Sequence, residues 1–280
     1  MLDRLPALII GLGVLAIVFG IVERRWPSVR NQRRLRQGLL TDLAWYAVTP
    51  TVGKLFTGIV VAVSVLTLAR IFGVGLTIEH LRGLAVRDTA VGRQPVGLQL
   101  VEFLLLADFL GYWQHRAFHS IGRLWRVHAV HHSSTELDWL SAVRVHPLND
   151  AISNTIVAAP LLLLGFSRLT VAAYLPFLTL YAIALHANVS WGYGALRYVI
   201  ASPAFHRWHH SAEAAALNRN FAGMFPVWDL VFGTFYLPKD RRARSFGVVG
   251  SALPSGFVGQ LLYPFRSTKR AAVAAEAVAG

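Results

Sequence analysis

Cysteine is absent from the 280 residues of this chain. Without cysteine the protein forms no disulfide, offers no thiolate ligand to a metal ion and holds no iron–sulfur cluster through thiolates. We therefore expect any metal site in this protein to be held mainly by nitrogen.

Charged residues are also scarce, at 15% of the chain, whereas hydrophobic residues make up 55%. A soluble domain normally carries about a quarter charged residues, so this composition indicates a membrane protein. Five apolar stretches approach the length that a helix needs to cross a bilayer; they cover residues 5–22, 39–69, 96–113, 151–166 and 169–185. We predict an all-α, multi-span protein with about four to five transmembrane helices. Pro50 and Gly53 interrupt the second stretch, which is either one long kinked helix or a short hairpin.

Acidic residues number only 14 against 27 basic ones, which gives a net charge of +13. In a soluble chain this excess would suggest nucleic-acid binding, but here the arginines gather beside apolar segments, so we expect no nucleic-acid partner. Six of them directly follow the first apolar run: Arg24, Arg25, Arg30, Arg33, Arg34 and Arg36. The positive-inside rule places this loop in the cytoplasm. Only three of the basic residues are lysine, which hints at a GC-rich bacterial genome and hence at a bacterial inner membrane.

Histidine is concentrated in one part of the chain, because ten of the eleven histidines lie between residues 115 and 210. Eight of these ten form three clusters: His115 and His119; His128, His131 and His132; His206, His209 and His210. Residues three or four apart share one helix face, so each cluster directs several imidazoles towards one point. Imidazole suits iron, zinc, copper and nickel, and three such clusters could hold more than one ion. The remaining histidine, His80, is expected to be an ordinary surface residue.

The predicted topology brings these clusters together. If residues 39–69 cross the bilayer once, residues 96–113 return to the cytoplasm and 151–185 form a hairpin that leaves and returns. All three clusters then lie in a cytoplasmic, histidine-rich helical cap. If residues 39–69 instead form a hairpin, the predicted topology no longer places all three clusters on the same side of the membrane.

The three clusters, His115-Arg-x-x-His119, His128-x-Val-His131-His132 and His206-x-x-His209-His210, resemble those of the fatty acid hydroxylase superfamily, which includes the sterol desaturases. The resemblance covers about residues 95–240. We therefore expect a fatty acid hydroxylase-like catalytic domain at 96–240, and the composition predicts transmembrane helices and a basic loop at 1–95 and a basic, alanine-rich tail at 241–280. The resemblance further implies two iron ions that use O2 to hydroxylate or desaturate a lipid or sterol C–H bond, with zinc able to replace iron in a recombinant preparation.

Two further histidines are candidate metal ligands by position. His186 follows an apolar helix where the family often places a ligand, although a histidine there also interacts favourably with the helix dipole. His146 lies in Arg-x-His-Pro and is either a ligand or a donor to one. A ligating histidine usually donates its other nitrogen to a carboxylate or carbonyl. We favour four partners of this kind, Asp108, Asn188, Asn220 and Asp229, and consider three more, Glu136, Asp138 and Asn218.

Two other classes of function remain open at this point. A membrane metal transporter or sensor would also use histidines, but its sites generally lie near the bilayer midplane. A zinc hydrolase would need three ligands and a glutamate base, and the chain has no His-Glu-x-x-His motif. An oxygenase also needs electrons, and no flavin or dinucleotide fingerprint is present, so we expect a separate reductase or electron carrier. The sequence does not specify the lipid substrate, nor hydroxylation rather than desaturation.

Overall fold

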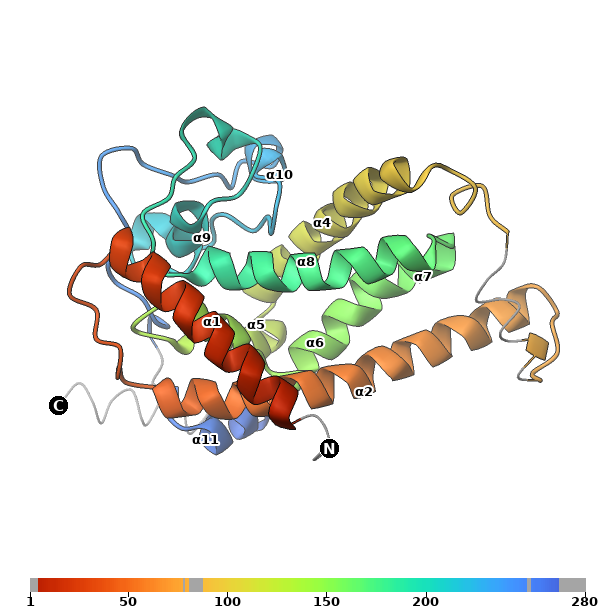
Figure 1. The fold of residues 1–280 in the computed structure, drawn as a ribbon, viewed down its shortest axis with the longest axis horizontal. Helices are drawn as coiled ribbons and strands as arrows, with labels where there is room; N and C mark the ends of the chain where they lie inside the picture. Colours follow the sequence, from red (N-terminus) through yellow and green to blue (C-terminus); the bar gives the residue numbers. More distant parts are fainter. Residues whose placement is uncertain (1–4, 78, 81–87, 251–252, 267–280) are drawn as a thin grey trace.

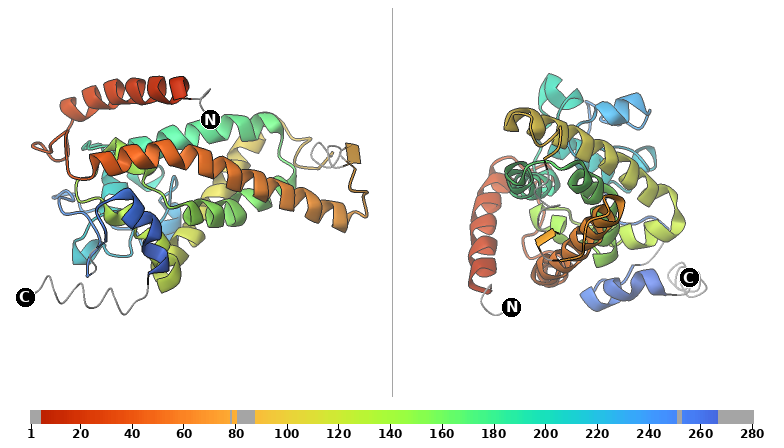
Figure 2. Two further views of the ribbon diagram at one scale, coloured as in Figure 1. Left: turned by 90° about the horizontal axis from the view of Figure 1, so that it is seen from below. Right: turned by 90° about the vertical axis from the view of Figure 1, so that its right-hand side faces the viewer.

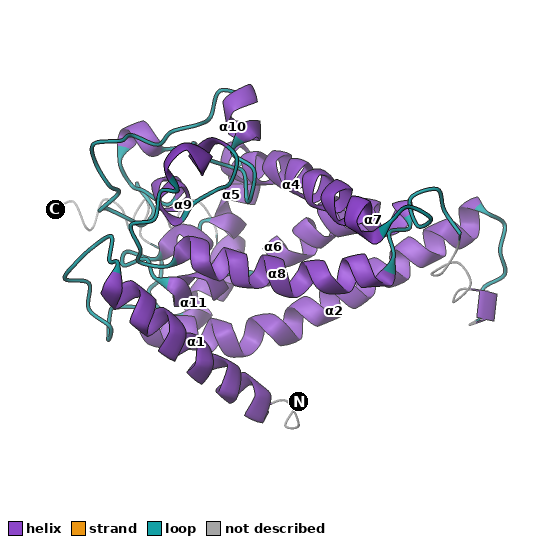
Figure 3. Cartoon of the chain, turned by 45° about the horizontal axis from the view of Figure 1, so that its top comes forward, coloured by secondary structure: helices purple, strands orange, loops and turns teal. Residues whose placement is uncertain are grey.

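The structure is a computed structural model that describes residues 5–77, 79–80, 88–250 and 253–266. The described residues form helices and loops, with two isolated β-bridges and no strand (Figure 3). The long helices are α1 (Leu5–Arg25), α2 (Leu39–Ile71), α4 (Val96–Ser120) and α8 (Arg168–His186). A further continuous span consists of α6 (Pro147–Ser153), the π-helical η4 (Asn154–Ala158) and α7 (Ala159–Leu164). These make five helical segments of the described chain that are long and apolar enough to cross a membrane, which confirms the predicted fold class.

Helix α2 decides between the two alternatives for the second apolar stretch, because it is one helix of 33 residues. Pro50 lies inside it, where a proline removes one backbone hydrogen bond but leaves the neighbouring turns intact. Because the second apolar stretch is one helix and not a hairpin, it meets the condition under which the predicted topology brings the three histidine clusters together. In Figure 1 the C-terminal ends of α1, α4 and α8 and the N-terminal ends of α2 and α6 all lie at the same end of the molecule.

A cap of short helices and loops covers that end, at the left of Figure 1. Its helices are α5 (Gly122–His128), η2 (His131–Ser133), η3 (Trp139–Val143), η5 (Gly194–Tyr198), α9 (Pro203–His209), η6 (Ala214–Ala216) and α10 (Val227–Val231). Most of the histidines lie in this cap or in the last turns of the spans that enter it. The fold therefore separates an apolar bundle from a polar cap.

The helices of the bundle pack through apolar side chains. Phe103 of α4, Leu161 of α7 and Tyr174 of α8 form one buried cluster. Helix α1 lies along the outside of the bundle (Figure 2) and has no buried residue. Its Phe19 stacks on Trp139 of η3 with 5.8 Å between ring centroids. A helix that is apolar all round and still exposes its side chains is suited to contact with lipid.

Part of the expected C-terminal tail is integrated into the fold. It contains α11 (Phe257–Leu262) and η7 (Tyr263–Phe265). Gln260 of α11 accepts a hydrogen bond from Trp45 Nε1 of α2 at 3.0 Å and donates to Ser133 Oγ of η2 at 3.2 Å. Residues 253–266 therefore belong structurally to the cap, whereas residues 267–280 of the tail lie outside the described chain.

Candidate metal centre

The structure brings nine of the ten candidate histidines into two groups. Within each group the possible ligand atoms all lie within 4.8 Å of one another. The first histidine group contains His115, His119, His128, His132 and His209. The second histidine group contains His131, His186, His206 and His210. Ligands from α4, α5, η2, α8 and α9 thus meet although they are far apart in the sequence.

The sequence clusters do not correspond to the groups one by one. Each group is built around residues four apart, because such residues lie on one face of a helical turn. His115 and His119, and likewise His128 and His132, contribute to the first group. His131 lies between His128 and His132 in sequence but belongs to the second group. His209 likewise belongs to the first group, whereas His206 and His210 belong to the second. Two of the three sequence clusters therefore contribute histidines to both groups.

Hydrogen bonds to the outer ring nitrogens determine how the imidazoles are oriented. In the second group, His186 Nδ1 donates to the Ala182 carbonyl at 2.7 Å and His131 Nδ1 donates to the Arg144 carbonyl at 3.2 Å. Since a carbonyl only accepts, Nδ1 carries the proton in both rings and Nε2 carries a lone pair. These two Nε2 atoms nevertheless lie 3.1 Å apart, so their contact is not a hydrogen bond. Two lone pairs at this distance repel each other unless a metal ion or a proton lies between them.

The first group has the same organisation. His115 Nδ1 donates to the Phe221 carbonyl at 2.8 Å, and His209 Nδ1 donates to the Arg219 carbonyl at 2.9 Å. Their Nε2 atoms face those of the other group members at 3.0–3.1 Å. His119 Nε2 is buried and has no hydrogen-bond partner within the described residues.

These separations fit a bound transition metal. For metal–nitrogen bonds of about 2.1 Å, adjacent ligands at a right angle lie about 3 Å apart. The Nε2–Nε2 contacts in the two groups measure 3.0–3.2 Å. Nitrogen-rich sites of five and four imidazoles suit iron, zinc, copper or nickel rather than magnesium or calcium.

Burial also prepares the rings to bind a cation. Six of the grouped histidines lie outside the membrane-spanning helices. Desolvation lowers the pKa of each of these six to well below the ordinary value of a histidine. These are His128, His131, His132, His206, His209 and His210. Their rings are therefore neutral at pH 7 and bring no positive charge of their own to the site.

His146 lies outside both groups, in contrast to the expectation from the sequence. Pro147 begins α6, so His146 is the N-cap residue and its Nδ1 accepts a hydrogen bond from the Leu148 N–H at 3.1 Å. Its Nε2 donates to the Leu261 carbonyl at 3.0 Å. Both ring nitrogens are thus occupied by the protein, and His146 joins α6 to α11. His80 is exposed, as expected.

Of the four favoured partner residues, Asp229 is linked to the candidate ligand His115 through hydrogen bonds to one peptide group. The peptide between Phe221 and Ala222 accepts from His115 Nδ1 through its oxygen and donates to Asp229 Oδ2 through its N–H at 2.8 Å. Asp229 also accepts from the Phe221 N–H and from Thr234 Oγ1. The fully buried carboxylate therefore fixes the carbonyl that orients His115.

The other three favoured residues hold backbone rather than imidazoles. Asp108 accepts from the N–H groups of Met224 and Phe225 at 2.7 and 2.8 Å. Asn220 donates to the carbonyls of Phe205 and Tyr236. The third residue, Asn188, pairs with the backbone of Val29, in the loop that follows α1. These three residues shape the cap, and these hydrogen bonds join their side chains to backbone groups of the described chain and not to the histidine rings.

One partner was not identified from the sequence. Asn149 of α6 offers its Oδ1 to His128 Nδ1 at 3.0 Å. No spacing rule relates the two residues, because they lie on different helices that meet only in the fold. The nearest signal was the neighbouring Arg-x-His-Pro motif, which marks the start of α6.

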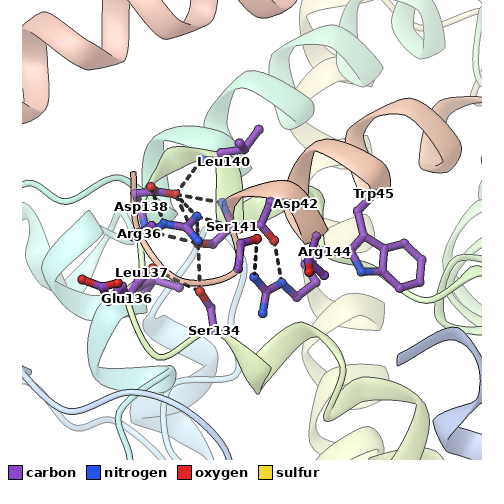
Figure 4. Close-up of polar contacts among 12 residues, drawn as sticks. Arg36, Asp42, Trp45, Ser134, Glu136, Leu137, Asp138, Leu140, Ser141 and Arg144 are labelled. Carbon is purple, nitrogen blue, oxygen red and sulfur yellow. Dashed lines mark hydrogen bonds and ion pairs between the residues drawn. The ribbon is translucent and has the colours of Figure 1, made fainter. Parts of the chain in front are cut away.

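A buried network of four charges lies beside the second group (Figure 4). Asp42 at the start of α2 binds Arg36 at 2.6 Å and Arg144 at 2.5 Å, and Arg36 also binds Asp138 at 2.5 Å. Arg144 is the residue whose carbonyl orients His131. Arg36 is therefore an internal residue, in contrast to its predicted place in an exposed basic loop, because its guanidinium pairs with Asp138 and shares Asp42 with Arg144.

A cavity of about 490 Å³ extends from the histidines into the helical bundle. Five histidines from both groups line it at one end, namely His115, His128, His131, His186 and His206. Apolar side chains of α4, α7 and α8 line most of the remainder. A smaller pocket of about 230 Å³ among cap residues reaches the first group beside His119 and Trp125.

The chain matches one family model and is similar to several proteins of known activity. Residues 100–234 match the family model of the fatty acid hydroxylases. The ornithine lipid hydroxylase OlsE of Rhizobium tropici is 34% identical over 172 residues, which cover 61% of this chain and 51% of that protein. The alkylglycerol monooxygenase of Homo sapiens is 34% identical over 134 residues, which cover 48% of this chain and 30% of that protein.

A more distant relative is the very-long-chain aldehyde decarbonylase GL1-6 of Oryza sativa subsp. indica, which is 27% identical over 139 residues. That match covers 45% of this chain and 21% of the rice protein. The chain thus spans about half the length, or less, of these relatives. No solved structure matches it significantly.

Proposed function

We propose that this chain is a member of the fatty acid hydroxylase family, whose model matches residues 100–234, and that it is an integral-membrane, O2-dependent enzyme that hydroxylates or desaturates a C–H bond of a lipid. One observation carries the proposal. The Nε2 atoms of two buried histidine groups converge beside the end of a long apolar cavity. A redox metal site and a space for an alkyl chain are thereby adjacent.

The nine grouped histidines are the proposed ligands of two iron ions, and His146 is not one of them. When bound, iron supplies the redox chemistry that an unactivated C–H bond requires, since acid–base groups alone do not break such a bond. In a hydroxylation, one atom of O2 enters the product and the other leaves as water, with two electrons and two protons consumed.

The residues of the chain position the reactants and keep water away. Carbonyl acceptors such as Phe221 O and Ala182 O hold the rings with Nε2 directed inwards. Such fixed ligand orientation raises metal affinity and limits reorganisation during the reaction. The apolar walls of the cavity, including Phe103 and Leu178, hold the alkyl chain in a dry environment beside the histidines.

The location of the site favours an oxygenase over a metal transporter. His186 is the last residue of α8, and His115 and His119 lie in the last two turns of α4. The site therefore lies at the helix ends beside the cap, whereas transporter sites generally lie near the bilayer midplane.

We place the cap on the cytoplasmic side of a bacterial inner membrane, because arginines gather in the loop between α1 and α2. Electrons come from a separate reductase or carrier. Five exposed arginines of that loop form a basic surface that would attract an acidic carrier: Arg24, Arg25, Arg30, Arg33 and Arg34.

The proposal is tested on protein purified from iron-replete cells. We expect about two iron ions per chain and O2 consumption that depends on added lipid and reductant. Replacement of His131 by alanine should remove both, while the matched change His80→Ala, at an exposed histidine outside the groups, should leave both intact. Stoichiometric zinc without O2 consumption would contradict the proposal, and lipid profiles of a deletion strain would identify the substrate.

A further inference from the structure

The large cavity extends along two helices of the bundle. Along α8 its lining residues run from Val171 to His186, and along α4 from Phe103 to His115. At a rise of 1.5 Å per residue, these stretches measure about 22 and about 18 Å. A lined stretch of this length accommodates an extended alkyl chain.

The lining of the cavity changes in character along its length. The half next to the histidines is lined by the polar side chains of Gln114 of α4, Asn149, Ser153 and Asn154 of the α6 span, and Tyr181 of α8. Asp108 lies near the middle of the α4 stretch, where its carboxylate accepts from the N–H groups of Met224 and Phe225. The wall of the far half is mainly apolar, with Phe103, Leu161 and Val171, and Tyr174, whose ring packs against Phe103, adds a hydroxyl group to it. Burying a polar headgroup against that wall would leave its hydrogen bonds unmade, whereas an alkyl chain gains from the same contact.

The π-helical segment η4 lies at the transition between the two halves. Asn154, its first residue, lines the cavity with the polar half, whereas Val157 and Ala158, at its end, line it with the apolar half. Wide π-turns of this kind are frequently found at functional sites. Here one short segment of the wall changes from polar to apolar.

From this polarity we infer the orientation of the substrate: a lipid binds with its polar head beside the histidines and the methyl end of an alkyl chain between α4, α7 and α8. The inference rests on the proposed function and adds to it the orientation of the substrate and the site of oxidation. Because the histidines and the polar half share one end of the cavity, the oxidised carbon lies a few bonds from the polar head, at a distance independent of chain length.

Spin-labelled probes test this orientation without enzyme turnover. The full-length protein in detergent is loaded with paramagnetic Co²⁺ or, as a control, with diamagnetic Zn²⁺, and mixed with stearic acid carrying a nitroxide near its carboxyl or near its methyl end. We expect Co²⁺ to broaden the spectrum of the carboxyl-end label more strongly. Stronger broadening of the methyl-end label, or equal broadening of both, would overturn the inference. Failure to bind Co²⁺ or Zn²⁺ would instead contradict the proposed metal site.

Two substitutions at the far end test where the methyl end lies. Val171→Phe and Ala158→Phe each fill part of the apolar half, and we expect stearic acid to bind about tenfold more weakly because a few methylene groups lose their place. The matched control is Ala173→Phe, on the exposed side of α8. Unchanged binding in both cavity variants, with normal metal content, would overturn the inference.

Product analysis completes the test. With single-chain lipids of increasing length, the position of oxidation counted from the polar head should stay constant. A position that stays constant when counted from the methyl end would overturn the orientation. An absence of oxidation with every lipid, despite normal probe binding, would count against the proposed function and not against the orientation.

Discussion

Replacing Asp42 with asparagine should destabilise the protein strongly, because the Asp42 carboxylate is the shared partner of two buried arginines. Its oxygens lie 2.6 Å from Arg36 Nη2 and 2.5 Å from Arg144 Nε, and the side chains of Asp42 and Arg36 are fully buried. Removing one member of a buried ion pair leaves an uncompensated charge and costs about 3–5 kcal/mol. The Arg144 carbonyl also orients His131, so the second histidine group should bind its metal less tightly.

The assay is the unfolding free energy in mixed detergent micelles, together with metal content. The matched control is Glu213→Gln, which removes a carboxylate from an exposed ion pair with Arg241 at 3.1 Å. An exposed pair contributes about 0–1 kcal/mol, so the control should unfold almost like the parent protein. If Asp42→Asn costs no more than the control, the network does not stabilise the fold as the geometry implies. The double variant with Arg36→Met should lose less than the sum of its two single changes, because both remove the same interaction.

Four other outcomes follow from the site. Asp229→Asn should weaken metal binding about 10–100-fold, measured by chelator competition, because it loosens the carbonyl that orients His115; unchanged affinity would remove Asp229 from this role. His146→Gln should keep the metal content of the parent protein, and loss of one ion would make His146 a ligand after all. Burial holds the histidine pKa values below the unfolded value of about 6.5, so the unfolded chain binds more protons as the pH falls. The metal-free protein should therefore be fully stable above about pH 7 and lose unfolding free energy towards about pH 5, and a flat profile would contradict this. Exchanging the arginines of the basic loop for glutamine should weaken carrier affinity in steady-state kinetics, and unchanged affinity would exclude that docking surface; the positions are Arg24, Arg25, Arg33 and Arg34.

Much of the fold was predictable because the bilayer constrains the sequence directly. Long apolar runs with few charges must form helices in lipid, since their backbone groups find no other partner there. The boundaries of α1 and α8 agree within three residues with the apolar runs, whereas α4 continues seven residues beyond its run, to Ser120, and so carries His115 and His119. The form of the second run was not predictable, because a proline within an apolar stretch is compatible with both a kinked helix and a hairpin.

The placement of single residues depended on contacts between distant segments. The sequence of His146 resembles that of a ligand, but Pro147 makes it the N-cap of α6 and turns its ring towards α11. Arg36 belongs by composition to an exposed basic loop, yet it neutralises Asp42 and Asp138. Pro147 is a local signal that places His146 at the start of a helix. In neither case, however, does the local sequence show which partner the fold brings near.

The sequence by itself determined the chemistry of this protein: histidine clusters at helical spacing, without cysteine, indicate a nitrogen-rich metal site on a membrane protein. The tertiary structure alone decided how these histidines are divided. His131 and His132 are adjacent in sequence, but they lie in the 3-10 helix η2, where successive side chains point about 120° apart, and so the two enter different groups. Only the packing of α4, α7 and α8 could place a long apolar cavity beside both groups, because its walls come from segments that are separate in the chain.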